Sequence, residues 1–270
     1  DFALRREDQP SDFFFVQGTD IHLREGATDL FDAYVHHVNA LEVPVAFVVH
    51  TGDLVIDTNR VNVDRAEVLF DLYDSHVAAL RPPLRNLPGN HEHVGVFNDA
   101  VAETDPSFGK GAYRQRYGPM TYVFRYGPCH FIALDGTILK GRSPTYGLTE
   151  QSASWAEAYL ATVGVDEPIV LMVHEPLENR PTEQRLAKAL ENKKLLATLC
   201  GHGHGRVIRP WSGVPQIMGG AVSYAWHGLL PFPPDPFGYV LYHVTGEDVE
   251  WVFLDYQEER SFDVAEPGYG

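Results

Sequence analysis

The feature of this sequence that most constrains its fold is a set of five short apolar runs, each of which stops at Asp, Asn or His. The runs cover residues 13–16, 45–49, 83–87, 169–173 and 195–199. Apolar runs of this length, bounded by glycine and polar residues, predict buried strands. Because ligands of open α/β sheets bind just beyond the carboxyl ends of the strands, we expect the polar residues after these runs to meet.

The polar residues that follow the runs are imidazoles and oxygen donors, with no thiolate among them. They are Asp20, His22, Asp53, Asn90, His174, His202 and His204. Oxygen and imidazole donors suit borderline divalent metals such as Zn, Mn or Fe. These seven candidates exceed what one four- to six-coordinate ion takes, so we expect two metal ions.

Helical patterns separate the first three runs. Apolar residues recur at helical spacing over residues 30–41, with Thr28 as the expected N-cap, and again over residues 61–80. This order of strand, helix, strand, helix and strand is typical of a layered α/β domain with largely parallel strands. The pattern alone therefore indicates an α/β fold.

The second half of the chain adds antiparallel pairing, because residues 122–134 predict a hairpin that turns at Gly127. Residues 93–119 show no periodicity and predict a long loop, either a functional lid or an irregular connector. We expect helices at 149–163 and 181–194, and strands at 206–208, 215–218, 239–244 and 249–254. The inward face of the first of these helices is expected to consist of Trp155, Ala158, Tyr159 and Thr162. Since no repeat or linker interrupts the chain, we expect one domain over residues 1–270.

Composition excludes some classes of function. The formal charge of −16 argues against a nucleic-acid groove, which needs a basic surface, and no apolar stretch is long enough to span a membrane. Cys129 and Cys200 lie in apolar runs, which favours two buried free thiols over a disulfide. The chain begins at Asp1 and shows no signal peptide, which fits a soluble protein, either cytoplasmic or a processed exported form, so the compartment stays open.

The motifs after the five runs, taken in order, resemble those of the calcineurin-like metallophosphoesterases. They read D-x-H, G-D, G-N-H-E, H and G-H-x-H, at residues 20–22, 52–53, 89–92, 174 and 201–204. The resemblance spans roughly residues 13–222. It implies a four-layer α/β/β/α sandwich, in which helices flank two mixed sheets.

The resemblance also assigns roles to the candidate residues. One metal would take Asp20, His22, Asp53 and His204, and the other Asp53, Asn90, His174 and His202, so that Asp53 bridges the two. The ions would be divalent or of mixed valence, drawn from Mn, Fe and Zn, and a hydroxide bridging them would be the nucleophile. His91 matches the catalytic histidine of the family, which assists the leaving group and does not bind metal.

The expected activity is hydrolysis of a small phosphate ester. The first motif, with His22 at its third position, resembles that of the bacterial cyclic-nucleotide-type class III phosphodiesterases. Purple acid phosphatases have a tyrosine ligand after the G-D motif, and no such tyrosine follows Asp53 here. The resemblance of the first motif favours a phosphodiesterase, with a phosphomonoesterase using the same site as the alternative, whereas the missing tyrosine argues only against an iron–tyrosinate centre. An alternative of another class is a catalytically silent scaffold that keeps the fold for protein binding.

Further histidines and one aspartate are candidates for a supporting role. His50, Asp135 and His227 are expected either to orient a ligand or to face substrate. The remaining histidines are expected at the surface or in the core, with His93 at the surface of its loop. The apolar, proline-rich stretch 223–238 would wall a pocket, pack on a second subunit in a homodimer, or fill the core.

Overall fold

Two mixed sheets form the framework of the protein. The computed structural model describes residues 10–224, 236–246 and 248–256. The five-stranded sheet has the order β13 (Asp248–Asp255), β12 (Gly238–Thr245), β1 (Asp12–Gly18), β2 (Val45–Thr51) and β3 (Leu84–Leu87). Strands β1, β2 and β3 are parallel, whereas β12 runs antiparallel to both of its neighbours. The predicted parallel order of the first three strands is therefore confirmed.

The second sheet has six strands. Its order is β10 (Arg206–Trp211), β11 (Val214–Gly219), β9 (Lys194–Cys200), β8 (Pro168–Val173), β5 (Cys129–Leu134) and β4 (Tyr122–Tyr126). The four inner strands are parallel, and the two edge strands β10 and β4 are antiparallel to their neighbours. The hairpin predicted around Gly127 is formed by β4 and β5.

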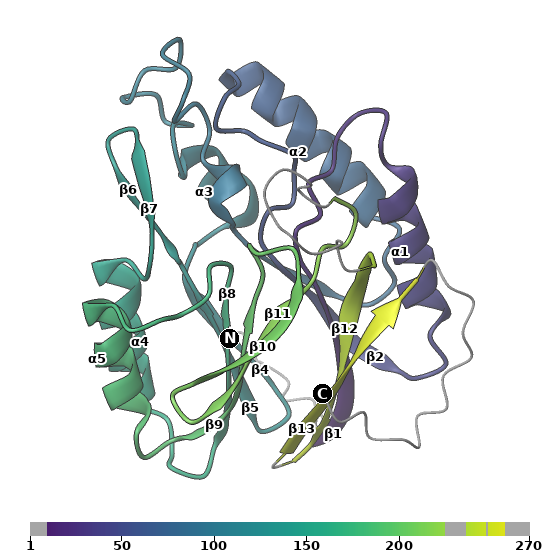
Figure 1. Cartoon of the computed structure of the whole chain (residues 1–270), viewed down its shortest axis with the longest axis vertical. Helices are drawn as coiled ribbons and strands as arrows, with labels where there is room; N and C mark the ends of the chain where they lie inside the picture. The colour runs from purple at the N-terminus through teal and green to yellow at the C-terminus, as the bar shows by residue number, and fades with distance from the viewer. Residues whose placement is uncertain (1–9, 225–235, 247, 257–270) are drawn as a thin grey trace, which may run out of the picture.

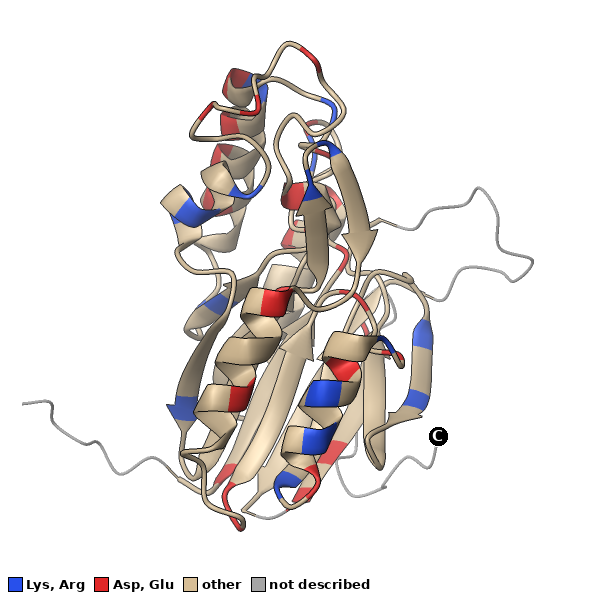
Figure 2. Ribbon diagram, turned by 90° about the vertical axis from the view of Figure 1, so that its left-hand side faces the viewer, with Lys and Arg blue, Asp and Glu red and all other residues tan. Residues whose placement is uncertain are grey.

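Helices cover the outer face of each sheet (Figure 1). Helices α1 (Asp29–Ala40) and α2 (Val63–Val77) share a core with the five-stranded sheet, and α4 (Glu150–Leu160) and α5 (Pro181–Leu190) share one with the six-stranded sheet. The charged positions of α4 are all acidic, whereas α5 carries both acidic and basic ones (Figure 2). The order of layers confirms the expected α/β/β/α sandwich.

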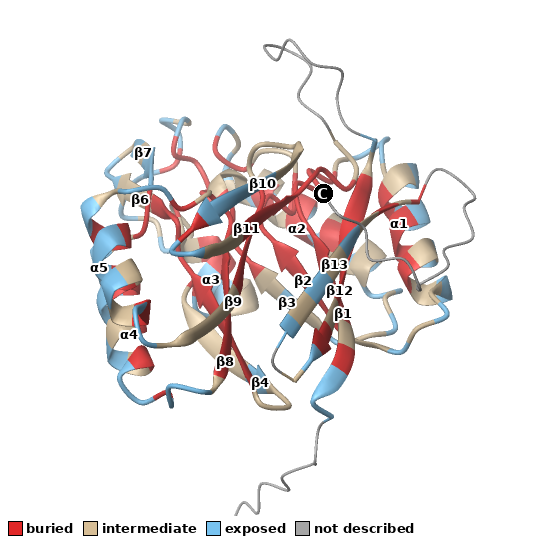
Figure 3. Ribbon diagram, turned by 60° about the horizontal axis from the view of Figure 1, so that its bottom comes forward, coloured by how far each residue is buried: buried red, intermediate tan, exposed pale blue. Residues whose placement is uncertain are grey.

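Aromatic rings fill the space between the sheets, and Figure 3 shows the buried strands that carry them. Phe15 and Phe47 stack with ring centroids 5.1 Å apart, and Phe131 from the other sheet meets Phe47 edge-on at 5.0 Å. Burying such rings dominates core energetics, and the offset and edge-on geometries are the favoured ones. This central core packs the two sheets face to face. The carboxyl ends of β2 and β8, one strand from each sheet, lie at the same edge of the sandwich.

The structure corrects the prediction for residues 93–119. Part of this segment is the short helix α3 (Gly111–Tyr117), whose seven residues are too few to give a clear helical period. A small hairpin follows, made of β6 (Thr137–Lys140) and β7 (Ser143–Tyr146). Arg142 at its turn donates hydrogen bonds to the carbonyl oxygens of Gly95 and Asn98, which fixes the hairpin to the irregular segment.

The inward face predicted for α4 is right for Trp155 and Tyr159, which are partly buried and pack against the core, and wrong for Ala158 and Thr162. Its buried residues are Ser152, Ala153, Ala156 and Leu160, whereas Ala158 and Thr162 are exposed. Small side chains let the helix lie close to the sheet and to α5, while the two large rings of Trp155 and Tyr159 stack on each other beside that face. Thr149 caps the helix, because its hydroxyl accepts the N–H of Ser152 at 3.0 Å.

Two further expectations concern the cysteines and the membrane. Cys129 and Cys200 are both buried free thiols. Within the described ranges, no helix combines the length and the apolar character needed to cross a membrane.

Candidate metal centre

The predicted ligands sit where strands turn sharply into loops. The 3-10 turn η1 (Asn90–Glu92), which follows β3, supplies Asn90. Of the six non-glycine residues with positive φ in the described chain, five are predicted ligands: Asp20, His22, Asp53, His202 and His204. Such backbone conformations cost about 1–3 kcal/mol each and persist where the surroundings enforce them, most often at functional sites. The strain is therefore concentrated where side chains must be aimed inward from the sheet edge.

One group of donors combines Asp20, His22, Asp53 and His204, whose ligand atoms all lie within 4.8 Å of one another. The Nε2 atoms of His22 and His204 are 3.1 Å apart. His22 Nε2 lies 3.5 Å from Asp53 Oδ2, and His204 Nε2 lies 3.3 Å from Asp20 Oδ1. Four donors converging from three loops match the number that a structural or catalytic ion takes.

A second group shares Asp53 with the first. Asp53, His174 and His202 also bring ligand atoms within 4.8 Å of one another, and His174 Nε2 is 3.1 Å from Asp53 Oδ2. Asn90 joins this group, since its Oδ1 lies 2.8 Å from His202 Nδ1. The structure thus brings together all seven residues, in the two overlapping sets that the family resemblance implies.

The chemistry of these donors fits bound cations. His174 Nδ1 faces the carbonyl oxygen of Thr51 at 2.8 Å and so carries a ring proton, which leaves the buried Nε2 facing the carboxylate of Asp53 at 3.1 Å. Burial lowers the pKa of His22 to about 3 and that of His202 to about 4, so both rings are neutral at pH 7, as ligands must be.

His174 behaves differently and leads to the same conclusion. Burial opposes its protonation, yet the carboxylate of Asp53 raises the pKa of His174 above its ordinary value. The negative charge of Asp53 therefore stabilises a positive charge at this position. In the absence of another cation, that charge is a proton on His174. A divalent ion would supply that charge and displace the proton.

Asp53 is held so that a single oxygen faces both groups. Its Oδ1 accepts the backbone N–H of His91 at 3.0 Å, which leaves Oδ2 directed toward His22 and His174. The loop at Gly89 passes so close that a Cβ there would lie 2.2 Å from Asp53 Oδ1. Only glycine fits this approach, which explains the glycine of the G-N-H-E motif.

Glu92 is a functional residue that the reasoning from sequence missed. Its buried carboxylate accepts four backbone N–H groups: Asp53 at 3.0 Å, Gly89 at 2.6 Å, Leu54 at 2.8 Å and Val55 at 3.3 Å. It therefore joins the loop after β2 to the loop after β3. Burial, together with the charge of Asp53, raises the pKa of Glu92 to about 7, against the effect of the N–H donors. The only signal in the sequence was its position at the end of G-N-H-E.

His91 lies beside the donor groups and belongs to neither of them. Its Nδ1 is 2.7 Å from the carbonyl oxygen of Ile56, which assigns the proton to Nδ1 and leaves Nε2 toward the centre, 3.9 Å from Asp53 Oδ2. The ring meets that of His22 edge-on at 4.7 Å. With its side chain 22% exposed, His91 remains open to a ligand at the centre.

The predicted supporting residues are placed elsewhere. His50 is buried, with Nε2 3.0 Å from the Tyr34 hydroxyl and Nδ1 2.7 Å from the Tyr73 hydroxyl, so both nitrogens are used in the core under α1 and α2. Neither hydrogen bond of the His50 ring reaches one of the seven predicted ligands. His227 lies outside the described residues.

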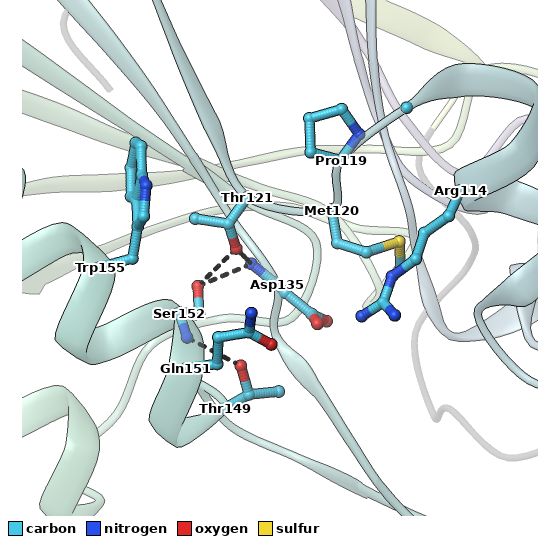
Figure 4. Close-up of a pocket in the computed structure, with 10 residues that line it drawn as sticks. Arg114, Pro119, Met120, Thr121, Asp135, Thr149, Gln151, Ser152 and Trp155 are labelled. Atoms are coloured by element: carbon cyan, nitrogen blue, oxygen red, sulfur yellow. Dashed lines mark hydrogen bonds between the residues drawn. The ribbon is translucent and has the colours of Figure 1, made fainter.

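Asp135 also has partners other than the seven ligands. Its carboxylate accepts two hydrogen bonds from Lys110 Nζ, at 2.6 and 2.8 Å. It lines a pocket of about 380 Å³ together with Arg114 of α3 and Gln151 of α4 (Figure 4). His93, expected at the surface, is 1% exposed, because its Nδ1 turns inward to the carbonyl oxygen of Asn90.

Comparisons with known proteins agree with this geometry. Residues 15–206 match the family model of the calcineurin-like phosphoesterases. The curated glycerophosphodiester phosphodiesterase GpdQ of Enterobacter lignolyticus (strain SCF1) is 28% identical over 181 residues, which is 63% of this chain. The match spans 60% of that relative, less than two thirds of its length.

Solved structures resemble the fold at low sequence identity. A dimetal phosphatase from Danio rerio superposes with a TM-score of 0.62 at 15% identity, covering 90% of this chain and 96% of that one. GAP50, described as the anchor in the inner membrane complex of Plasmodium, gives a TM-score of 0.60 at 14% identity, covering 92% and 86%. At this identity the likeness concerns the fold.

Proposed function

The chain belongs to the calcineurin-like phosphoesterase family, and from that premise we propose that it is a dimetal hydrolase of phosphate diesters. The observation that carries the proposal is the pair of donor groups that share the single oxygen Asp53 Oδ2. A carboxylate placed between two cations offsets their mutual repulsion, which is the arrangement of two-metal phosphoesterase sites.

Each predicted ligand has a place in this proposal. Asp20, His22, Asp53 and His204 would hold one ion, and Asp53, Asn90, His174 and His202 the other. Two divalent ions at such a site supply Lewis acidity for the phosphoryl oxygens and a hydroxide nucleophile near neutral pH. Asn90 contributes an oxygen without adding negative charge.

His91 is proposed to assist the leaving group. The carbonyl of Ile56 holds the Nδ1 proton, so that Nε2 faces the centre and can carry a proton to the oxygen that leaves. A general acid in this position stabilises developing negative charge on the leaving oxygen and typically contributes about 10²–10⁴-fold. The backbone N–H of the same residue orients Asp53, so His91 supports the centre in two ways.

A diester is favoured over a monoester by the sequence relative, a glycerophosphodiester phosphodiesterase that is 28% identical over the matched part. A monoesterase with the same site remains the second candidate. A silent binding scaffold is disfavoured, because a protein without catalysis has no need of strained ligand residues and of buried imidazoles gathered around one carboxylate.

The test is hydrolysis of bis(4-nitrophenyl) phosphate and 4-nitrophenyl phosphate by protein loaded with Mn²⁺, Zn²⁺ or Fe²⁺, with metal-free protein as a blank. We expect metal-dependent hydrolysis with a larger kcat/KM for the diester. His202→Ala should abolish it, whereas His36→Ala, an exposed histidine on α1, should not. Turnover that does not depend on metal would contradict the proposal, and a preference for the monoester would assign the second candidate.

A further inference from the structure

At the rim of the metal centre lies Arg24, which has no carboxylate partner among the residues that the structure describes. The guanidinium carbon of Arg24 is 4.8 Å from the centre of the Tyr224 ring. That ring in turn lies 5.3 Å from the ring of His22 and 6.3 Å from that of His204. A single aromatic ring therefore separates this positive charge from two predicted metal ligands.

The backbone on both sides of this stack is fixed. Leu23 pairs with Val55 in a bridge, and the N–H of Ala27 closes a turn on the carbonyl of Arg24 at 3.2 Å. On the other side, the Ser223 hydroxyl donates to the carbonyl of Ile21, next in the chain to His22. Arg24 and Tyr224 are thus both attached to the loop that carries Asp20 and His22. Their positions are therefore fixed relative to these two predicted ligands.

The charge of Arg24 is not used within the described part of the molecule. Its neighbour Glu25 pairs instead with Arg65, at 2.6 Å. Other arginines show the usual pattern of an acidic protein: Arg116 and Arg185 each bind two or more carboxylates. Among the described residues no carboxylate lies within 4.0 Å of the Arg24 guanidinium, and no hydrogen bond satisfies its N–H groups.

The metal centre itself does not need this charge. Asp20 and Asp53 are the only carboxylates among the predicted ligands, so two divalent ions would already leave the centre positive toward a scissile phosphate. Arg24 lies outside this set, beyond Tyr224, and so faces a different part of the substrate. A guanidinium offers a planar set of donors that matches the oxygens of a carboxylate or a phosphate.

We propose that Arg24, held on Tyr224, forms a subsite for an anionic group on an organic arm of the substrate. The substrate class is then phosphoesters that carry a second carboxylate or phosphate in addition to the scissile one. This inference rests on the proposed function, because it assigns the arm of the ester that the metal centre hydrolyses. Stacking on the ring reduces the freedom that the guanidinium loses on binding.

The experiment uses three 4-nitrophenyl phosphodiesters that share the leaving group and differ in the second arm: pentyl, 4-carboxybutyl and 4-phosphonobutyl. Arg24→Met should lower kcat/KM for both anionic arms by about tenfold more than for pentyl, since a charge-assisted hydrogen bond is lost. Arg24→Lys should recover part of this difference. Arg85→Met is the matched control, because exposed Arg85 of β3 also stacks on an aromatic ring, that of Phe124 in β4, at 5.4 Å.

Binding provides a readout that does not depend on turnover. Calorimetry of the Mn²⁺-loaded protein should show tighter binding of 5-phosphonopentanoate than of pentylphosphonate. Arg24→Met should remove this difference and Arg85→Met should retain it. The preference should also weaken as salt rises, because a partly exposed charge pair is screened.

The outcomes separate this inference from the proposed function. If the wild-type protein hydrolyses all three diesters and Arg24→Met slows them equally, the subsite is wrong and the hydrolase assignment stands. If no diester is hydrolysed but the binding preference depends on Arg24, the diesterase proposal fails and the subsite stands. Equal binding of the two phosphonates by the wild-type protein overturns the subsite whatever the activity.

Discussion

Replacing Glu92 by Gln should damage both the stability of the protein and its metal centre. Each carboxylate oxygen of Glu92 accepts two backbone N–H groups: Asp53 and Gly89 on Oε2, and Leu54 and Val55 on Oε1. A glutamine has a single acceptor oxygen, so its amide NH₂ must face two of these donors whichever way it is oriented.

The magnitude follows from this count. A buried donor that loses its acceptor costs about 1–3 kcal/mol, so two lost N–H partners should lower the free energy of unfolding by about 2–6 kcal/mol. In a protein of this size that corresponds to a Tm lower by roughly 5–20 °C. Because Asp53 and the Gly89 loop are both displaced, metal affinity should fall about 10–100-fold, as for other residues that orient ligands.

A second buried glutamate provides the control. Glu183 is 1% exposed and accepts the backbone N–H groups of Glu178 and Arg180 at the start of α5, and none of these hydrogen bonds involves a predicted ligand. Both N–H groups donate to the same oxygen, Oε2, which the amide oxygen of a glutamine can replace, so Glu183→Gln should lower the Tm less than Glu92→Gln and leave metal affinity unchanged. The assays are thermal unfolding of metal-free protein and competitive metal titration with a chelator. Unchanged metal affinity in Glu92→Gln would refute the reasoning.

Further predictions address the other parts of the site. His91→Ala should keep both metals while slowing hydrolysis by about 10²–10⁴-fold for alkoxide leaving groups and less for nitrophenolate, and an equal loss for both would remove the proposed acid role. Gly89→Ala should lower metal content measured by mass spectrometry, since a Cβ would lie 2.2 Å from Asp53 Oδ1; full occupancy would contradict the close approach. Burial lowers the pKa of His50 to about 3, so the unfolded state binds the extra proton between about pH 6.5 and pH 3 and the stability of metal-free protein should fall as pH falls through that window. His50→Gln should reduce the pH dependence of urea unfolding by up to about one proton, and an unchanged slope would show that His50 does not titrate in this way.

The placement of the candidate ligands could be predicted because it depends on a simple rule of sheets. Five apolar runs that end in Asp, Asn or His become strands whose carboxyl ends share one edge, so Asp53 and His174 meet although they are far apart in the chain. The parallel order of β1, β2 and β3 and the β4–β5 hairpin follow from equally local signals.

What could not be predicted depends on contacts between distant segments. Glu92 was missed because the sequence does not reveal the four backbone N–H groups that donate to its carboxylate. A glutamate after a histidine is ordinarily taken for a surface residue. His93 was misplaced for the same reason, since its burial depends on how the loop folds back. The packing face of α4 was predicted only in part, because Trp155 packs on the core but stays partly exposed, whereas small residues such as Ala156 are fully buried.

The central claim, two ions that share Asp53, is tested most directly by anomalous scattering from crystals grown with Mn²⁺. We expect two anomalous peaks about 3.5–4 Å apart, with the Asp53 carboxylate between them and His174 and His204 on opposite sides. A single peak at full metal saturation, or two peaks of which Asp53 contacts only one, would contradict the account.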